Sequence, residues 1–95
     1  MYLFGAEKEI PVESKTYDRI ASYEQTAILL YNDQEFKAGE FVAFREVDAE
    51  GNYTRHWAEA ELTLVIENYP GLESGYCVLV FHVFAQTLKE ERKTE

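Results

Sequence analysis

The sequence predicts one small α+β domain, with a mostly antiparallel β body and a single helix near its N-terminus. Two observations support this prediction. The chain has 95 residues that are 46% hydrophobic and 15% aromatic, which is enough for one apolar core and too little for two. Nearly all its aromatic residues are Phe or Tyr, and these favour strands, where flat rings pack across a pleated surface.

The charge balance is strongly acidic. Eighteen acidic side chains against nine basic ones give a formal net charge of -9. This charge repels nucleic-acid phosphates unless the cations gather on one face, so it disfavours non-specific nucleic-acid binding. A solubilising surface is the simplest interpretation of the excess acid.

The single cysteine excludes several kinds of site. Cys77 lies within the apolar run 76–81, and one cysteine supports neither an internal disulfide nor a thiolate metal site. No apolar run reaches membrane-spanning length, and charges at Glu7, Lys8 and Glu9 interrupt the region where a signal peptide needs an apolar core. We therefore expect a cytoplasmic protein with no membrane partner.

The N-terminal quarter is expected to contain the helix. After Pro11, the residues Val12, Thr16 or Tyr17, Ile20 and Tyr23 recur at three- and four-residue spacing. This spacing predicts an amphipathic helix over residues 12–23, with the proline near its start, where a missing N–H is harmless. The apolar lead 1–5 fits either an edge strand or a segment folded back on the body.

The first two strands are predicted on either side of a polar turn. Residues 25–31 are rich in apolar side chains and are followed at once by Asn32-Asp33, which predicts a short buried strand that ends in a turn. Gly39 allows a tight bend before the second strand, 40–47. The segment 48–52 then predicts a hairpin connection, with Gly51 in the left-handed conformation.

The third strand is predicted over residues 53–67 because its side chains alternate in polarity. Trp57 and Val65 fall on the wetter face, so we expect part of that face to be covered. The face toward the core is expected to hold Ala58, Ala60, Leu62, Leu64 and Ile66, and the face toward water Glu59, Glu61, Thr63 and Glu67.

The last strand is predicted to be the central one. A loop at 68–75 contains Pro70 and two glycines. Residues 76–85 are apolar on both alternating faces, which is typical of a strand covered on both sides. The domain is therefore expected to span 1–86, followed by a charged tail at 87–95.

The order of these segments resembles a known family. The features that carry the resemblance are a strand ending at Asn32-Asp33, the turn 35–40, a strand ending at 45–48, and the segments 51–54, 71–72 and 75–79. Together they resemble the DUF3850 family, a branch of the ASCH superfamily with the PUA-like fold, over about residues 10–81. The resemblance implies a small, mostly antiparallel β-barrel with one helix packed at one end. It also implies an association with RNA or modified nucleosides, and one ASCH subgroup hydrolyses acylated cytidine.

The chain departs from the ASCH pattern at its charged positions. A Gly-Lys-Lys-Thr-type turn corresponds here to residues 23–26, of which only Thr26 is kept. The acidic and basic residues that follow that turn correspond to Ile28 and Leu30, and a basic residue after the Asn-Asp pair corresponds to Gln34. Phosphate contacts need donors and cations, so we expect the inherited charged site to be lost or reshaped.

Six residues are the candidate ligand contacts. Tyr53, Arg55 and Trp57 share one side of the third strand, and Arg45 faces them across the hairpin. Such a patch can stack a base or anchor a protein, and plain cross-strand packing is the structural alternative. The expected ligand-binding set is Thr26, Asn32, Arg45, Tyr53, Arg55 and Trp57.

Catalytic and metal sites are not predicted. Hydrolysis requires a general base within hydrogen-bond reach of a nucleophile. His56 and His82 lie on separate strands without a carboxylate pattern, which is a weak metal signal, and no cofactor is expected. The groups with suitable chemistry, whose spacing does not bring them together, are Glu24, Thr26, Tyr31, Asp33, Arg45 and His82.

Three functions remain open from the sequence. The first is a non-enzymatic binding module for RNA or a nucleotide. The second is an acidic inhibitor or adaptor that presents Glu59, Glu61 and Glu67 to a basic protein that handles nucleic acid. The family's frequent phage and mobile-element contexts favour this second function. The third is an amidohydrolase-like enzyme acting on modified nucleosides. The oligomeric state is not predicted.

Overall fold

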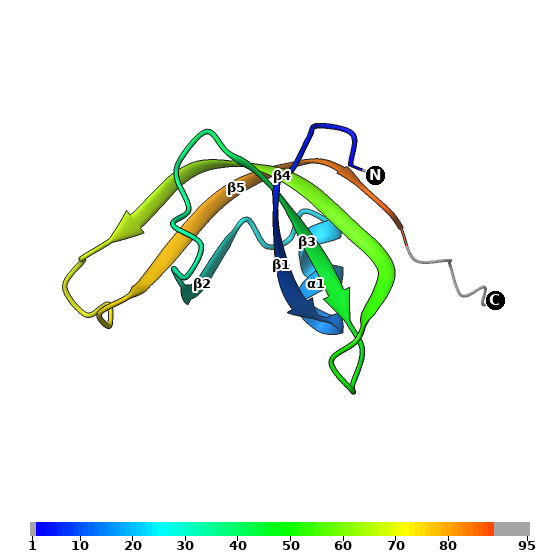
Figure 1. The fold of residues 1–95 in the computed structure, drawn as a ribbon, viewed down its shortest axis with the longest axis horizontal. Coiled ribbons are helices and arrows are strands. Elements are labelled where there is room, and N and C mark those ends of the chain that lie inside the picture. The colour runs from blue at the N-terminus through cyan, green and yellow to red at the C-terminus, as the bar shows by residue number, and fades with distance from the viewer. Residues whose placement is uncertain (1, 89–95) are drawn as a thin grey trace.

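The computed structural model describes residues 2–88 as one five-stranded sheet and one helix. The spatial order of the strands is β1-β3-β4-β5-β2, and every pair is antiparallel except β1–β3. The sheet curls into a half-barrel with α1 on its inner side (Figure 1). The elements are β1 (Lys8–Glu13), α1 (Ser14–Ala21), β2 (Ala27–Tyr31), β3 (Phe41–Val47), β4 (Tyr53–Glu67) and β5 (Tyr76–Gln86). The predicted α+β class, mostly antiparallel with one helix, is confirmed, whereas the sheet is open between its two edges, β1 and β2.

The curvature of the sheet comes from its two longest strands, β4 and β5. The register between them slips twice, at Glu59/Ala60 and at Leu62/Leu64, and an extra residue in one strand bends and twists a pair. The extra residue at Thr63 also shifts the alternation of β4. Leu62 is fully buried and Val65 packs on the core, whereas Leu64 is 50% exposed. The prediction that Leu64 and Ile66 face the core is therefore wrong.

The core fills the inner side of the sheet, beneath α1. The helix buries Tyr17, Ile20 and Ala21 there, and the Phe44 and Phe81 rings meet with 4.6 Å between centroids. On β5 the inner face is formed by the buried side chains of Cys77, Leu79, Phe81 and Val83. Burial, together with the nearby charges of Glu67 and Asp33, raises the pKa of the Cys77 thiol, so this cysteine is a core residue and not a reactive thiolate.

Strand β5 is not covered on both sides. It lies second from the edge, and β4 is the middle strand of the sheet. Its outward side chains Tyr76 and Phe84 are 36% and 45% exposed. The expectation of a central strand with two buried faces is wrong, because the helix packs on the inner face only.

The helix is shorter than predicted, because residues 8–13 form strand β1. Gln34 Nε2 donates to the Glu9 carbonyl at 3.0 Å, so the main chain of Glu9 points away from β3. In a parallel pair, the main-chain groups of residues two apart point to the same side of the strand. The side of Pro11 that lacks an N–H therefore faces the open edge, where proline is tolerated. Val12 is buried as a strand residue opposite Glu46, and Tyr23 lies beyond the end of the helix.

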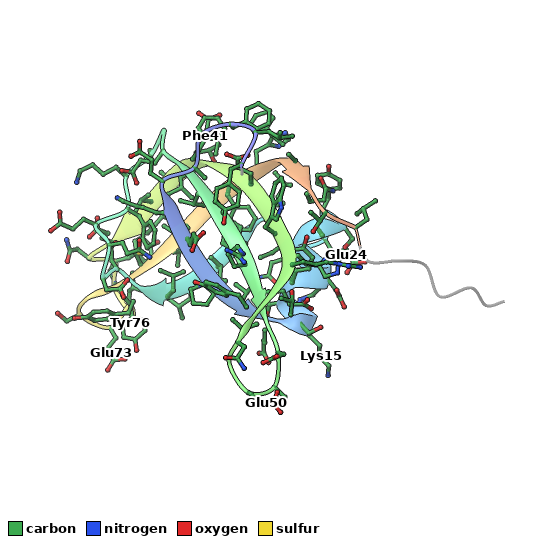
Figure 2. The ribbon with its side chains drawn as sticks, turned by 45° about the vertical axis from the view of Figure 1, so that its right-hand side comes forward. Lys15, Glu24, Phe41, Glu50, Glu73 and Tyr76 are labelled. Carbon is green, nitrogen blue, oxygen red and sulfur yellow. The ribbon has the colours of Figure 1, made fainter. Side chains whose placement is uncertain are left out.

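The N-terminal segment, residues 2–7, folds back on the outer face of the sheet. The Phe4 and Ala6 N–H groups each donate to the Glu59 carboxylate at 2.8 Å. The Phe4 ring stacks on Phe41, with centroids 5.5 Å apart, and Figure 2 shows Phe41 beside this segment. Glu59 was expected to face water, but it is fully buried because the folded-back segment covers it.

The C-terminal end of the described chain joins the body through Thr87. The Tyr17 hydroxyl donates to the Thr87 carbonyl at 2.6 Å, and the Trp57 N–H donates to its Oγ1 at 3.0 Å. The rest of the expected charged tail, residues 89–95, lies outside the described residues. Within residues 2–88, no helix is long and apolar enough to cross a membrane.

Candidate functional site

A cleft of about 400 Å³ lies between the two free edges of the sheet, β1 and β2. The start of α1 and the turn after β2 also contribute to its walls. Figure 1 shows β1 and β2 as the two ends of the curled sheet, with no strand between them. The residues that line the cleft are Ile10, Pro11, Val12, Glu13, Thr16, Ile28, Leu29, Leu30, Tyr31, Asp33, Gln34 and Phe36.

Strand β2 turns part of its backbone toward this cleft. The Phe81 N–H donates a hydrogen bond to the Thr26 carbonyl, and the Asn32 N–H donates one to the Gly75 carbonyl. These bonds show that the even-numbered residues pair with β5, so the odd-numbered residues present their N–H and C=O groups to the open edge. At the open edge, Gln25 Nε2 donates a hydrogen bond to the Ala27 carbonyl. The Asp33 N–H donates to the Tyr31 carbonyl. Leu29 is thus the odd-numbered β2 residue whose N–H and C=O are both available to a ligand within the described chain, since the Ala27 and Tyr31 carbonyls already accept these bonds.

The floor of the cleft is apolar. Ile10, Val12 and Phe36 are buried there, and Ile28 and Leu30 pack against the same core. Ile28 and Leu30 are the two positions at which the family resemblance implied an acidic and a basic residue. Strand β2 was expected to be buried, but it is an edge strand that buries only this inward side, and Leu29 and Tyr31 are 59% and 56% exposed.

The rim of the cleft is polar and acidic. Its polar side chains come from Glu13, Thr16, Tyr31, Asp33 and Gln34. Among the described residues that line it there is no Lys or Arg. An apolar floor under hydrogen-bonding groups suits a flat, uncharged or cationic ligand, while the two carboxylates repel phosphate.

The turn after β2 is held in place by its own side chains. Asn32 Oδ1 accepts a hydrogen bond from the Phe36 N–H at 2.8 Å, and Glu35 takes the left-handed conformation, with φ of 55°. Gln34 ties the turn to β1 through the Glu9 carbonyl. Asn32, predicted as a ligand contact, therefore uses its side-chain oxygen to shape the wall of the cleft.

A second cluster forms around Arg45 on the outer face of the sheet. Its Nη1 donates to Glu9 Oε2 and to the Tyr2 hydroxyl, both at 3.2 Å, and its Nη2 donates to the Thr54 carbonyl at 3.2 Å. The guanidinium carbon lies 4.3 Å from the centroid of the Tyr53 ring. Trp57 meets the Tyr2 ring edge-on, at 5.4 Å between centroids. The predicted contact between Arg45 and Tyr53 is therefore present, whereas Arg45 and Trp57 are linked indirectly, because each contacts Tyr2.

The electrostatics of this cluster hold the N-terminal segment in place. Burial lowers the pKa of Arg45, but Tyr2 and Glu9 outweigh it, and the pKa is raised. Burial and the hydrogen bond to Glu9 raise the pKa of Tyr2. Arg45 Nε is buried without a partner among the described residues. The guanidinium is thus largely committed to internal contacts, as cross-strand packing would require.

The remaining predicted residues do not join either group. Thr26 is exposed and uses its carbonyl to pair with β5, and Arg55 is exposed on β4. Of the groups considered for hydrolysis, Tyr31 and Asp33 line the cleft, whereas Arg45 and His82 lie on the outer face. No group of three His, Cys, Asp or Glu side chains that could hold a metal occurs within residues 2–88.

Sequence reasoning missed much of the cleft. Val12 and Thr16 were expected in a helix and Phe36 in a turn, and Ile10 was assigned to no element, so nothing brought these four residues together. Two signals pointed to the site: Pro11, which is typical of an edge strand, and the family positions at Ile28 and Leu30.

The family model described as a domain of unknown function, DUF3850, matches residues 8–81. The chain belongs to the DUF3850 family. The DUF3850 match begins at the first residue of β1 and includes every residue that lines the cleft. Tyr2 and the rest of the N-terminal segment lie outside it. A comparison with curated proteins finds no match to the chain.

Proposed function

We propose that this DUF3850 protein is a small non-enzymatic binding module of the PUA-like, ASCH type, and that its ligand occupies the cleft between β1 and β2. The observation that carries the proposal is the hollow seam of the half-barrel, where an apolar floor lies under hydrogen-bonding groups. Ligand sites in proteins commonly combine these two features. The family resemblance adds support, since its functional positions correspond to Ile28 and Leu30 in that floor.

The chemistry of the cleft favours a nucleobase or nucleoside over an RNA backbone. A flat base would rest on the apolar floor, with its edge toward the Leu29 peptide groups and the side chains of Asp33 and Gln34. Phosphate binding relies on Lys, Arg or clustered N–H donors. The described residues that line the cleft include no Lys and no Arg. The RNA or nucleotide ligand expected from the sequence is thereby narrowed to the base itself.

A titration with nucleosides tests this proposal. Cytidine, acylated cytidine and adenosine are added separately to the protein and to the variant Asp33→Ala, with binding measured by calorimetry. We expect at least one nucleoside to bind, and Asp33→Ala to weaken it about tenfold, since a hydrogen bond to a charged group contributes about 1.5 kcal/mol.

The matched control is Glu50→Ala, which removes the same charge from the exposed β3–β4 hairpin. Figure 2 labels Glu50 at the tip of this hairpin. Its affinity is expected to equal that of the unaltered protein. Flat titrations with all three nucleosides, or equal losses in both variants, would reject the proposed site.

The alternative function implied by the family resemblance is an amidohydrolase that acts on modified nucleosides. The same mixtures, analysed by chromatography, test it through conversion of acylated cytidine to cytidine. Turnover that disappears in Asp33→Ala would replace the non-enzymatic proposal. Binding without turnover supports the module.

A further inference from the structure

Two rows of apolar side chains cross the outer face of the sheet, away from α1. Leu29 of β2 pairs with Val78 of β5, which pairs with Ile66 of β4. Residues opposite one another in neighbouring strands share a face, so these side chains form one row. A parallel row contains Val80 and Leu64. We call this set, with Tyr31 at its end, the outer apolar face: Leu29, Tyr31, Leu64, Ile66, Val78 and Val80.

The outer apolar face is open to solvent. Leu29, Tyr31 and Leu64 are 59%, 56% and 50% exposed. Within residues 2–88, α1 packs on the opposite side of the sheet, and the N-terminal segment contacts another part of the outer face, around Phe41, Phe84, Glu59 and Trp57. Contiguous exposed apolar surface of this kind marks interaction sites in soluble proteins.

A hollow opens at the end of this face, beside the β4–β5 loop. Its volume is about 520 Å³, and Ile66 and Val78 form one wall. The loop supplies the other wall through Tyr69, Pro70 and Leu72. An apolar hollow within a flatter surface accepts a single large side chain, which is how the central anchors of protein interfaces bind.

The charge around the face has one sign. Residues 20–36 and 56–88, which contain β2, most of β4 and all of β5, include no Lys or Arg. The same stretches contain exposed or half-exposed acids at Asp33, Glu61, Glu67 and Glu73. Figure 2 shows Glu73 with Tyr76 at the end of the molecule that carries the β4–β5 loop. An apolar centre with acidic surroundings is complementary to a basic partner surface.

We propose that the outer apolar face binds a protein whose contact surface has an aromatic or aliphatic anchor surrounded by Lys and Arg. The anchor fills the hollow beside Pro70, and the cations meet the acids around it. A second copy of this chain brings like charges to the same face, and nucleic acid brings phosphates, so both are disfavoured. Leu29 and Tyr31 border both this face and the cleft, whereas Leu64, Ile66, Val78 and Val80 belong to the outer apolar face alone.

A selection experiment with defined probes tests this surface. A displayed library of small scaffolds with randomised surfaces is selected on the full chain, and binders are sequenced and measured by surface plasmon resonance. We expect enrichment of Lys and Arg around aromatic or Leu residues. Affinity should fall at least tenfold in Leu64→Asp and in Leu29→Asp, and should weaken as salt rises, because exposed charges are screened.

The matched control is Leu3→Asp, which makes the same change at a 74% exposed leucine outside the face. Circular dichroism and urea unfolding confirm that each variant is folded. If either Leu64→Asp or Leu29→Asp does not fold, the other variant alone tests the face. Acidic or neutral binders, or binders that tolerate both face variants, would overturn the proposal. So would a dimer in analytical ultracentrifugation that Leu64→Asp converts to monomer, since the occupant would then be a second copy.

Discussion

Glu59 shows how a single residue can depart from the pattern of its strand. Its neighbours in β4 alternate as the sequence predicts, with Ala58 and Ala60 toward the core. Glu59 points the other way but is still fully buried, because its carboxylate accepts the N–H groups of Phe4 and Ala6. A buried charge is tolerated when it is hydrogen-bonded, so Glu59 fixes the N-terminal segment on the sheet.

Replacing this carboxylate should release the segment. We expect Glu59→Ala to lower the free energy of unfolding by about 2 kcal/mol, since hydrogen bonds to charged groups contribute about 1.5–3 kcal/mol each and the freed N–H groups regain water. Urea unfolding measures the loss, and amide exchange at Phe4 and Ala6 should accelerate. Glu61→Ala is the control on the same strand, because the Glu61 carboxylate accepts no hydrogen bond from the residues that the structure describes. Equal effects of the two changes would count against this role.

At the scale of elements, strand β1 carries the largest correction to the sequence-based account. The spacing of Val12, Tyr17 and Ile20 fits a helix, yet Val12 belongs to a strand and the other two to α1. A stretch of sequence that crosses a strand–helix junction can show helical spacing by accident. Only the pairing of β1 with β3, some thirty residues away in sequence, decides between strand and helix for residues 8–13. Because β1 pairs with β3 alone, its other side is a free edge of the half-barrel.

Proline substitution distinguishes the two assignments. In the ladder, the main chain of Val12 faces β3, so Val12→Pro removes a hydrogen bond and should cost about 2 kcal/mol more than Val12→Ala. At the first position of a helix, proline would be harmless. Pro11→Ala should change stability by less than about 1 kcal/mol, because its missing N–H lies on the open edge. Urea unfolding of the three variants measures this, and a stable Val12→Pro protein would contradict the strand.

Other elements could be predicted because their signals are local. The bounds of β4 and the left-handed Gly51 match the expectation, since alternation and turn chemistry lie within a few residues. The bulge at Thr63 could not be predicted, because its hydroxyl bonds the Val80 carbonyl on another strand. The cleft escaped prediction for the same reason: its walls come from residues 10–16 and 28–36, and only the curl of the whole sheet brings them together.

At the scale of the whole molecule, the curved sheet separates two surfaces of different chemistry. The cleft between β1 and β2 lies on the open seam, where the Leu29 peptide groups and an apolar floor are available. The outer face carries the Arg45 cluster at one end and the outer apolar face at the other. Arg45 is committed to Tyr2, Glu9 and Tyr53, and for this reason our proposal places the ligand in the cleft and not on the patch around Arg45.

One titration tests this division directly. Amide and indole signals of the ¹⁵N-labelled protein are followed by NMR as the nucleoside that binds most tightly is added. Trp57 is the only tryptophan, so its indole N–H reports on the outer cluster, while the Leu29 amide reports on the cleft. We expect the Leu29 amide to shift to saturation while the Trp57 indole stays in place. A shift at Trp57 with Leu29 unchanged would contradict the account and return the ligand to the Arg45 cluster.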